Sequence, residues 1–573
     1  MLTAPVCAYI NWAAYDEISD VIELTEELAL RELGEVARLR RLGARFDYYV
    51  MDAYWFANDG GYRTWRTPHW PAGSDEWFRR CAEEGLLPGL WIASNDQGPL
   101  EVLPEWADSY DSHARAFCMF SGGFLAHLME TLTIWADRGV RLFKFDFVNF
   151  DAVPDALRAF LLPSEIRAAN VTAFRSALAA FRRERPEVLL LAYNGLDELP
   201  IQGNNWRDVR RAVDLRWLEV FDSLYCGDPR IADVPMWSFW RAKDVYSDHQ
   251  VRYYQAMGFP AARIDNSAFM IGDTGTCYRR KAAAWKGMLL LSLARGGWVN
   301  TYYGEMERLS DEDGRWLARA QGLFLPLQES GRWSSFGPLP VEGRPYGFIA
   351  SDAGGSLVTV VNPSQEMVRV PIPAAGEARV LFHDAGFAPV VEHGAITLSA
   401  EQMAVAATGA YADPRYDLGV QVDVVVPADI RRLEAAFAPD GSHALTATFP
   451  APAGALRLVV RQADPKGDPL RTSGGALPGG RPLGELLQFT VAQQGRAIRA
   501  DIRYDKAIWS GLSWAVAEVP AGALEPGEPV SVRFETAEPR PVTLSFEAYA
   551  VRYAGDEPGP EGPAQKAKGA FAP

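Results

Sequence analysis

Short apolar runs alternate with longer stretches of helical period from Pro5 to about Leu325, and this alternation limits the fold more than any other feature of the chain. It is typical of repeated βα units, which build a parallel sheet. Eight units in roughly 320 residues match the size of a (β/α)₈ TIM barrel. We predict this barrel for residues 1–325, with strands at Val6–Ile10, Tyr48–Met51, Leu87–Ile92, Leu142–Phe147, Val188–Ala192, Glu219–Leu224, Ala262–Ile264 and Gly297–Thr301.

Two stretches between these strands have a clear amphipathic pattern, ELTEELALRELGEVARLRRLG and AHLMETLTIWADRG. Each ends in a glycine, the residue that most readily adopts the left-handed conformation just past a helix. We therefore predict a scaffold helix in each stretch.

Beyond Leu325 apolar residues recur at every second position, as in YGFIAS and SLVTVVNPS, and Gly and Pro separate the runs. This period predicts antiparallel strands. At 573 residues the chain is also too long for one hydrophobic core. We predict a β-sandwich over 326–410, a second β-sandwich over 418–555 and a disordered tail over 556–573. The second sandwich either binds carbohydrate or covers the barrel, and its few aromatic residues favour covering.

The charge balance limits the possible partners. Lys and Arg total 57 against 73 Asp and Glu, a formal net charge of −16, which disfavours nucleic acid and anionic membrane surfaces. A neutral oligosaccharide or glycoside fits better. The 18 Trp and 21 Tyr include rings suited to stacking on sugars, although most aromatic side chains fill cores.

Cysteine and histidine spacing gives no sign of a metal. The five cysteines are scattered without CxxC spacing, and the seven histidines form no HExxH or comparable pair, so we expect reduced thiols and no metal site. The first twenty residues lack the basic and apolar regions of a secretory signal, and no apolar run reaches 18 residues. We therefore expect a cytoplasmic location.

The segment RLFKFDFVNF carries the strongest chemical signal. Lys144 and Asp146 alternate with phenylalanines and so share one side of a strand, which we expect to be the barrel interior. Burying charge without a partner is costly. The pair is therefore either a structural ion pair or a carboxylate nucleophile whose ionised form a neighbouring ammonium favours.

A second signal is FDSLYCGDPRIADVPMW, where Asp228, Arg230 and Asp233 follow an apolar strand. Glycoside hydrolysis needs two carboxyl groups across the scissile bond, so one of these aspartates is a candidate acid/base, unless the segment is an ordinary Asp-rich turn.

The third signal is YYVMDAYWF, where a carboxylate beside aromatic rings suits sugar binding. Its candidates, with three further substrate-binding residues near strand ends, are Asp52, Trp55, Trp91, Asn194 and Asp265.

Taken in order, these segments resemble the barrel of glycoside hydrolase families 27 and 36, the α-galactosidase clan. INWAAY resembles the first strand, LGARFDYYVMDAYWF the Asp-Asp-Gly-Trp strand, GLWIAS the Gly-Leu-Trp strand, and KFD the Lys-x-Asp nucleophile strand. RIADVPMW resembles the Arg…Asp acid/base loop, and LARGGWVNTYYGE the last strand. The similarity covers nearly the whole predicted barrel, with six short motifs in the same order.

The resemblance implies that Asp146 is the nucleophile and Asp233 the acid/base, oriented by Arg230, while Lys144 and Asp52 bind sugar hydroxyls. Ala53 stands where the clan has a second aspartate that holds galactose. The interval from Arg to Asp is one residue shorter than in the clan, which keeps Asp228 as an alternative acid/base. We also expect no counterpart of the large N-terminal β-domain of family 36.

The sequence thus predicts a retaining α-glycoside hydrolase that needs no cofactor. Two alternatives remain, a transglycosidase of the raffinose-synthase type and a non-catalytic carbohydrate-binding protein. A metal-dependent barrel hydrolase is disfavoured because clustered His ligands are not found.

Overall fold

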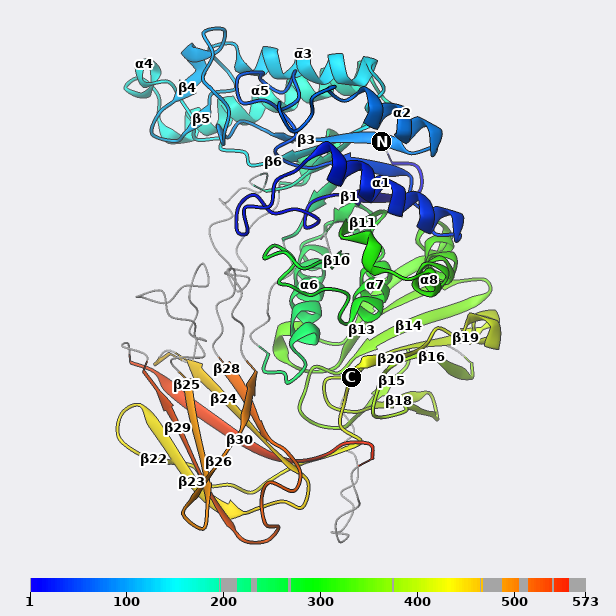
Figure 1. The fold of residues 1–573 in the computed structure, drawn as a ribbon, viewed down its shortest axis with the longest axis vertical. Helices are drawn as coiled ribbons and strands as arrows, with labels where there is room; N and C mark the ends of the chain where they lie inside the picture. The colour runs from blue at the N-terminus through cyan, green and yellow to red at the C-terminus, as the bar shows by residue number, and fades with distance from the viewer. Residues whose placement is uncertain are drawn as a thin grey trace.

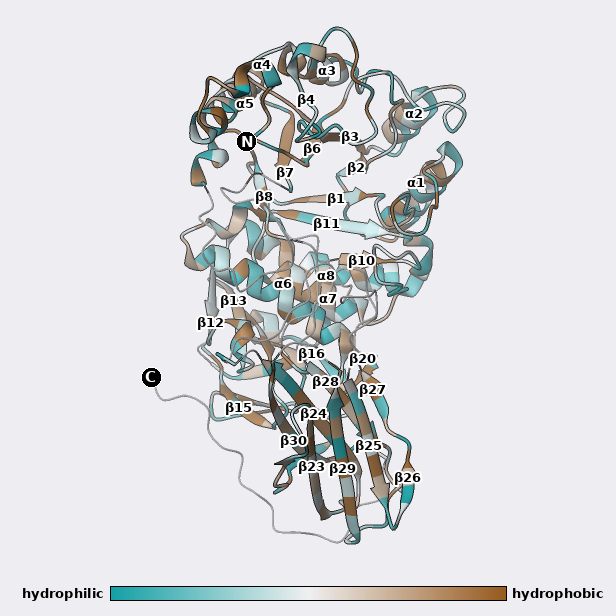
Figure 2. Cartoon of the chain, turned by 90° about the vertical axis from the view of Figure 1, so that its left-hand side faces the viewer, coloured by the Kyte–Doolittle hydropathy of each residue, from teal (hydrophilic) through white to brown (hydrophobic). Residues whose placement is uncertain are grey.

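The computed structural model describes residues 2–194, 196, 214–227, 234–265, 269–373, 376–463, 465–466, 487–503, 514–537 and 541–555. Figure 1 shows three parts along the long axis of the molecule, with a parallel sheet and its helices at one end. Helices α6, α7 and α8 lie between this sheet and a first group of antiparallel strands, and a second antiparallel group forms the other end (Figures 1 and 2).

A nine-stranded sheet makes up the first part, in the order β10-β11-β1-β2-β3-β6-β7-β8-β9. Every neighbouring pair in it is parallel. Its strands are β1 Val6–Ile10, β2 Tyr48–Met51, β3 Leu87–Ala93, β6 Leu142–Asp146, β7 Leu189–Ala192, β8 Ser223–Tyr225, β9 Ile264–Asp265, β10 Phe269–Ile271 and β11 Val299–Gly304.

The sheet curls strongly. The hydroxyl of Tyr193, which follows β7, lies 2.8 Å from the hydroxyl of Tyr303 in β11. In a flat sheet these strands would be five spacings apart, or about 24 Å. The two edge strands are also consecutive in the chain, since β9 ends at Asp265 and β10 begins at Phe269. The sheet is therefore curved in the manner of a TIM barrel.

Only β1 and β2 have the predicted bounds; the other six predicted strands differ by one or more residues, and the sequence does not predict β10. Short 3₁₀ turns account for the differences at two of these strands. Residues Leu215–Glu219 form a 3₁₀ turn, because the Asp214 side chain accepts a hydrogen bond from the Arg216 backbone N–H, and so β8 begins only at Ser223. A second such turn, at Ala261–Arg263, follows Pro260 and shortens the strand predicted at Ala262–Ile264.

Helices alternate with the strands, as the periodicity predicts. In α1 the Thr25 hydroxyl accepts a hydrogen bond from the Leu28 N–H, and just past the helix Gly43 has φ +100°. Gly139 ends α3 in the same way, with φ +113°. The helices are α1 Glu26–Arg41, α2 Asp75–Glu83, α3 Phe124–Asp137, α4 Asp155–Arg158, α5 Pro163–Glu184, α6 Phe239–Ala256, α7 Trp285–Ala294 and α8 Asp311–Ser330; a short hairpin joins β4 Tyr110–Asp111 to β5 Ala116–Phe117.

The change of period beyond Leu325 marks the change from parallel to antiparallel strands. A six-stranded sheet, β12-β13-β14-β19-β16-β20, and a three-stranded sheet, β15-β18-β17, share a cluster of buried Val, Ile and Leu. Only the β16 and β20 pair of the six-stranded sheet is parallel. The strands are β12 Arg332–Phe336, β13 Tyr346–Asp352, β14 Gly355–Val361, β15 Val368–Pro371, β16 Ala378–Ala385, β17 Val390–Glu392, β18 Ala395–Leu398, β19 Met403–Gly409 and β20 Gly419–Val425.

Two five-stranded antiparallel sheets follow, β21-β30-β24-β28-β27 and β22-β23-β29-β25-β26. Their apolar side chains meet in one further cluster, which includes Phe449 and Leu458. The strands are β21 Asp429–Arg432, β22 Ala438–Pro439, β23 Ala444–Pro450, β24 Ala455–Ala463, β25 Leu487–Gln493, β26 Arg496–Ile498, β27 Asp501–Arg503, β28 Trp514–Val519, β29 Pro529–Thr536 and β30 Thr543–Arg552.

Buried charges, rather than apolar side chains alone, join α6 to the antiparallel strands. Arg241 pairs with Asp384 of β16 at 2.7 Å and with Asp244 on its own helix. Asp248 of the same helix pairs with Arg295 at 2.7 Å and accepts a hydrogen bond from the Tyr346 hydroxyl. Because these groups are buried, each needs its partner in place, and together they fix the helix on the sheet.

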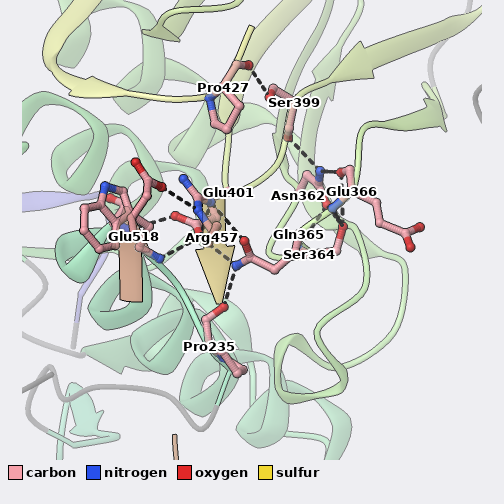
Figure 3. A network of polar contacts seen from close by, with 12 residues as sticks. Pro235, Asn362, Ser364, Gln365, Glu366, Ser399, Glu401, Pro427, Arg457 and Glu518 are labelled. Carbon is pink, nitrogen blue, oxygen red and sulfur yellow. Dashed lines mark hydrogen bonds and ion pairs between the residues drawn. The ribbon is translucent and has the colours of Figure 1, made fainter. Parts of the chain in front are cut away.

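A second polar network connects all three parts of the molecule (Figure 3). Arg457 of β24 donates to Glu518 of β28 at 2.9 Å, to Glu401 at 3.2 Å and to Gln365 at 2.9 Å. Glu401 in turn accepts hydrogen bonds from the Trp237 and Ser238 N–H groups, just before α6. The guanidinium thus links both antiparallel groups to the chain segment that enters the parallel sheet's helices.

The cysteines, the possible metal ligands and the possible membrane-spanning helices can also be compared with the predictions. The five cysteines are all buried, and none is in a disulfide. Within the described ranges, no three His, Cys, Asp or Glu side chains are grouped so that they could hold a metal ion. In the same part of the chain, no helix is long and apolar enough to cross a membrane.

The Arg457 network gives the first testable prediction. Arg457→Met leaves the buried carboxylates of Glu401 and Glu518 without their cation, which should lower the free energy of unfolding by roughly 3–5 kcal/mol. Chemical denaturation measures the change. Arg461→Met, on an exposed position of the same strand, is the control and should have little effect. Equal effects of the two substitutions would show that the network contributes no stability of its own.

Candidate active site

The carboxyl ends of the parallel strands bring together most of the predicted site residues. In a barrel-like sheet this edge is where functional side chains gather. Six of the predicted residues lie on β2, β3, β6, β7 or β9, or within two residues of the end of one of these strands, and all six are at least partly buried: Asp52, Trp91, Lys144, Asp146, Asn194 and Asp265. Residues that lie far apart in the sequence are therefore grouped at one edge of the sheet.

Asp146 ends β6, and its carboxylate is surrounded by hydrogen-bond donors. One oxygen, Oδ1, accepts from the Phe147 N–H at 3.0 Å, from the Asn194 N–H at 3.1 Å and from Asn194 Nδ2 at 2.9 Å. The other, Oδ2, accepts from Trp91 Nε1 at 3.2 Å. Trp91 can reach it because it pairs in register with Lys144, so that both side chains lie on the face of Asp146.

Lys144 faces the same interior but is paired with a different carboxylate. Its ammonium lies 2.8 Å from Oδ2 of Asp52, at the end of β2, and both side chains are buried. The ammonium also lies over the Tyr193 ring, 4.3 Å from its centroid, and 5.6 Å from that of Tyr303. The structural ion pair suggested by the strand pattern, Lys144 with Asp146, is therefore not the one that forms. Asp52 is the direct partner of Lys144, and Asp146 is a neighbouring charge.

Two tyrosines and a threonine also line this interior, and none of them belongs to a predicted site motif. The Tyr193 hydroxyl donates to Oδ2 of Asp265 at 2.5 Å, and Thr301 Oγ1 donates to Oδ1 of the same carboxylate at 3.1 Å. Tyr303 contacts the Tyr193 hydroxyl. Their position at strand ends is the signal that could have revealed them, since Tyr193 directly precedes Asn194 and Tyr303 alternates with Thr301 along β11.

Burial and neighbouring charges shift the ionisation of the central pair. Burial raises the pKa of Asp146 above its ordinary value, although Lys144, Trp91 and Asn194 all favour the ionised form. Burial also opposes the charge on Lys144, but the Asp52 carboxylate outweighs it, and the pKa of Lys144 lies above its ordinary value. The interior thus holds a permanent ammonium beside a carboxylate that is costly to ionise.

One predicted substrate-binding residue lies elsewhere. Trp55 is 0% exposed, and its Nε1 donates to the Trp91 carbonyl oxygen at 3.0 Å. Its ring packs among Phe56, Trp65 and Trp135 in the core. The prediction that Trp55 contacts a sugar is therefore not supported, because the chain turns at Tyr54, with φ +71°, and directs the indole inward.

The central part of the second predicted segment lies outside the described residues, which stop at Gly227 and resume at Val234. Asp228, Arg230 and Asp233 all fall in this gap. The acid/base assignment and the distance between its carboxyl group and that of Asp146 consequently remain predictions from the sequence.

The described geometry can support one kind of chemistry well. A buried carboxylate fixed by four donors, beside a permanent cation, is a preorganised nucleophile or charge stabiliser. The Asp52 carboxylate keeps acceptor capacity next to it, since its oxygens receive only the Ala53 N–H and the Lys144 ammonium among the contacts of the described residues. Such acceptors suit the hydroxyl groups of a sugar.

No family model matches this sequence, and no curated protein matches it. Among solved structures, the chain is similar to a GH36 α-galactosidase variant from Geobacillus stearothermophilus in complex with raffinose, with 14% identity, a TM-score of 0.46, and coverage of 71% of this chain and 56% of that chain. This protein therefore spans little more than half of that α-galactosidase.

Two other solved structures are similar over a comparable share of this chain. A variant of the trehalulose synthase MutB is 12% identical, with 70% of this chain and 98% of that chain covered and a TM-score of 0.44. The α-glucosyl transfer enzyme XgtA is 11% identical, with coverages of 71% and 99% and a TM-score of 0.45.

The raised pKa of Asp146 predicts a stability that depends on pH. The pKa of this aspartate is near 3.9 in the unfolded chain and higher in the folded protein, so the unfolded chain loses the proton first as pH rises. Between these two pKa values, rising pH therefore lowers the free energy of unfolding. Asp146→Asn removes this effect. We expect the free energy of unfolding of this variant, taken relative to that of the wild type, to rise from pH 4 to pH 7.

Denaturant titration of both proteins at several pH values measures this margin between the two free energies. Asp151→Asn, at an exposed aspartate in the connection after β6, is the matched control for the substitution itself. A margin for Asp146→Asn that does not change with pH would mean that the folded protein ionises Asp146 as easily as the unfolded chain does.

Proposed function

We propose that this protein is a retaining α-glycosidase, with Asp146 as its nucleophile and Asp233 as its acid/base. The observation that carries the proposal is the Asp146 carboxylate, held by Trp91 and Asn194 beside the ion pair of Lys144 and Asp52. The proposal includes closure of the curved sheet into a (β/α)₈ barrel and assembly of the antiparallel sheets as β-sandwiches.

The contacts of Asp146 favour one of its two oxygens as the attacking atom. Among the described residues, three donors occupy Oδ1, whereas Oδ2 accepts one hydrogen bond, from Trp91. Oδ2 therefore keeps more lone-pair density for bond formation. The donors on Oδ1 hold the carboxylate in one orientation, which lowers the entropic cost of the attack.

The reaction then proceeds in two displacements. Oδ2 of Asp146 forms a bond to the anomeric carbon while the bond to the leaving oxygen breaks, and Asp233 gives that oxygen its proton. In the second step Asp233 takes a proton from water, the water oxygen bonds to the anomeric carbon, and the carboxylate of Asp146 is released. The sugar leaves with its original anomeric configuration.

Further residues have supporting roles. Asp52 and Lys144 bind sugar hydroxyls, with Asp265 and Asn194 contributing to the same pocket, and Arg230 orients the acid/base. Asp228 is the alternative acid/base if Asp233 is not correctly placed. Trp91 supplies both a hydrogen bond to the nucleophile and an aromatic face.

The nucleophile can be tested by chemical rescue. Asp146→Gly should lower turnover by roughly four orders of magnitude or more, because no other group can form the covalent intermediate. Azide should restore part of the activity by entering the vacated space and attacking from the same face. The rescued product should be a glycosyl azide of inverted configuration, identified by NMR.

Two controls accompany the rescue. Asp151→Gly changes an exposed aspartate a few residues away and should leave turnover unchanged. Asp233→Ala should keep most of its activity only on substrates whose leaving groups need no protonation. Near wild-type turnover of Asp146→Gly would exclude Asp146 as the nucleophile.

A second test concerns the sugar. Ala53 offers no carboxylate at the position where the resemblance places a galactose-binding aspartate, and its carbonyl already accepts the Tyr15 hydroxyl at 2.5 Å. We therefore expect kcat/KM on an aryl α-galactoside to be roughly tenfold or more below that on another aryl glycoside. A screen of aryl α- and β-glycosides of galactose, glucose, arabinose, fucose and N-acetylgalactosamine measures this ratio. A clear preference for α-galactoside would contradict it.

A further inference from the structure

Phe147 does not lie where the strand pattern predicts it. Alternation along RLFKFDFVNF places it with Phe143 and Phe145, on the face away from Lys144. Those two side chains are fully buried, but Phe147 is 46% exposed. The difference arises because β6 ends at Asp146, and Phe147 has φ +43°, a left-handed conformation that is unfavourable for a bulky residue.

The groups that hold Asp146 also fix this backbone conformation. The Phe147 N–H donates to Oδ1 of Asp146, and its carbonyl accepts the Asp96 N–H at 3.2 Å. The next residue, Val148, donates its N–H to the Asn194 carbonyl at 3.2 Å. Because both neighbouring strand ends are tied to this point, the unfavourable conformation is built into the site. Strained residues of this kind are concentrated where function requires a particular side-chain direction.

The ring of Phe147 is directed toward the candidate site. It meets Trp91 edge to face, with centroids 6.2 Å apart and planes at 68°. Trp91 in turn donates to Asp146, and its ring is parallel to that of the buried Phe56, with centroids 6.1 Å and planes 4° apart. Three rings therefore form a wall beside the carboxylate, and its outermost ring, Phe147, is the one open to solvent.

We propose that the exposed ring of Phe147 contacts substrate, packing against the apolar C–H face of the sugar bound next to Asp146. This inference rests on the proposed function, because it takes Asp146 as the reacting group. It identifies a specificity residue that neither the motifs nor the charge pattern indicated. Sugar rings present such apolar faces, and aromatic side chains bind them with a rigid surface at low cost in conformational entropy.

The left-handed conformation makes a sharp test possible. Phe147→Gly removes the ring and also relieves the backbone, because glycine adopts positive φ readily. A purely structural role predicts lower stability in this variant. The proposal predicts unchanged or higher resistance to denaturant together with a KM raised roughly threefold to tenfold, while kcat changes less, since the contact is made in both ground and transition states.

The substrate for these measurements is the aryl α-glycoside that the wild type hydrolyses fastest in the screen above. Phe147→Tyr keeps the ring and should restore a KM close to the wild-type value. Phe160→Gly, which removes an aromatic ring that is 81% exposed in the same connection, is the matched control and should leave KM unchanged.

The outcomes separate this inference from the proposed function. If the wild type hydrolyses no glycoside in the screen and calorimetry detects no binding of the corresponding free sugars, the proposed function fails. If the wild type is active and Phe147→Gly keeps the wild-type KM, the nucleophile assignment is untouched and the role of Phe147 is overturned. Loss of stability in Phe147→Gly without a change in KM would likewise overturn it.

Discussion

The buried ammonium of Lys144 is the constraint on which the arrangement of this protein depends. A charge removed from water requires an opposite charge and polarisable neighbours close by. Here Asp52 of the β2 end supplies the carboxylate, and the rings of Tyr193 and Tyr303 face the cation from two other strands. Strands that lie several positions apart in the sheet can reach one ammonium only if the sheet curls. The curvature and the site at its carboxyl edge are thus two aspects of one electrostatic requirement.

At the same site, favourable hydrogen bonds to Asp146 are opposed by the burial of its charge. Four donors and a nearby cation favour the ionised carboxylate of Asp146, yet burial raises its pKa above the ordinary value. A carboxylate whose ionised form is destabilised by burial is more reactive than a well-solvated one. Such destabilised groups are common at the active sites of enzymes. The left-handed backbone at Phe147 is a second unfavourable feature at the same strand end. The segments after β3 and β7 hold both residues in place, because they donate hydrogen bonds to the Phe147 carbonyl and to the Asp146 carboxylate.

Farther from the site, buried charges determine how the parts of the molecule are joined. Arg241 and Asp248 of α6 are paired with groups of the six-stranded sheet and its neighbours. Arg457 holds Glu401 and Glu518, and Glu401 binds the backbone just before α6 (Figure 3). Apolar interfaces tolerate sliding, whereas hydrogen-bonded ion pairs fix one geometry because a displaced partner leaves a charge buried and unpaired. These junctions accordingly specify one placement of the antiparallel strands against the helices.

The sequence by itself determined where most strands of the parallel sheet lie, the change from parallel to antiparallel strands at about Leu325, and the shared face of Lys144 and Asp146. Each follows from the spacing of apolar residues along a short segment. Only the tertiary structure decided that Lys144 pairs with Asp52, 92 positions away, and that Trp91 and Asn194 hold Asp146. It also places Trp55 in the core and exposes Phe147 to solvent, and the alternation of apolar residues predicts neither. Spacing fixes which face a side chain occupies within a strand, but the partner across the sheet and the direction taken after the strand ends depend on curvature and loop hydrogen bonds, which no single segment encodes.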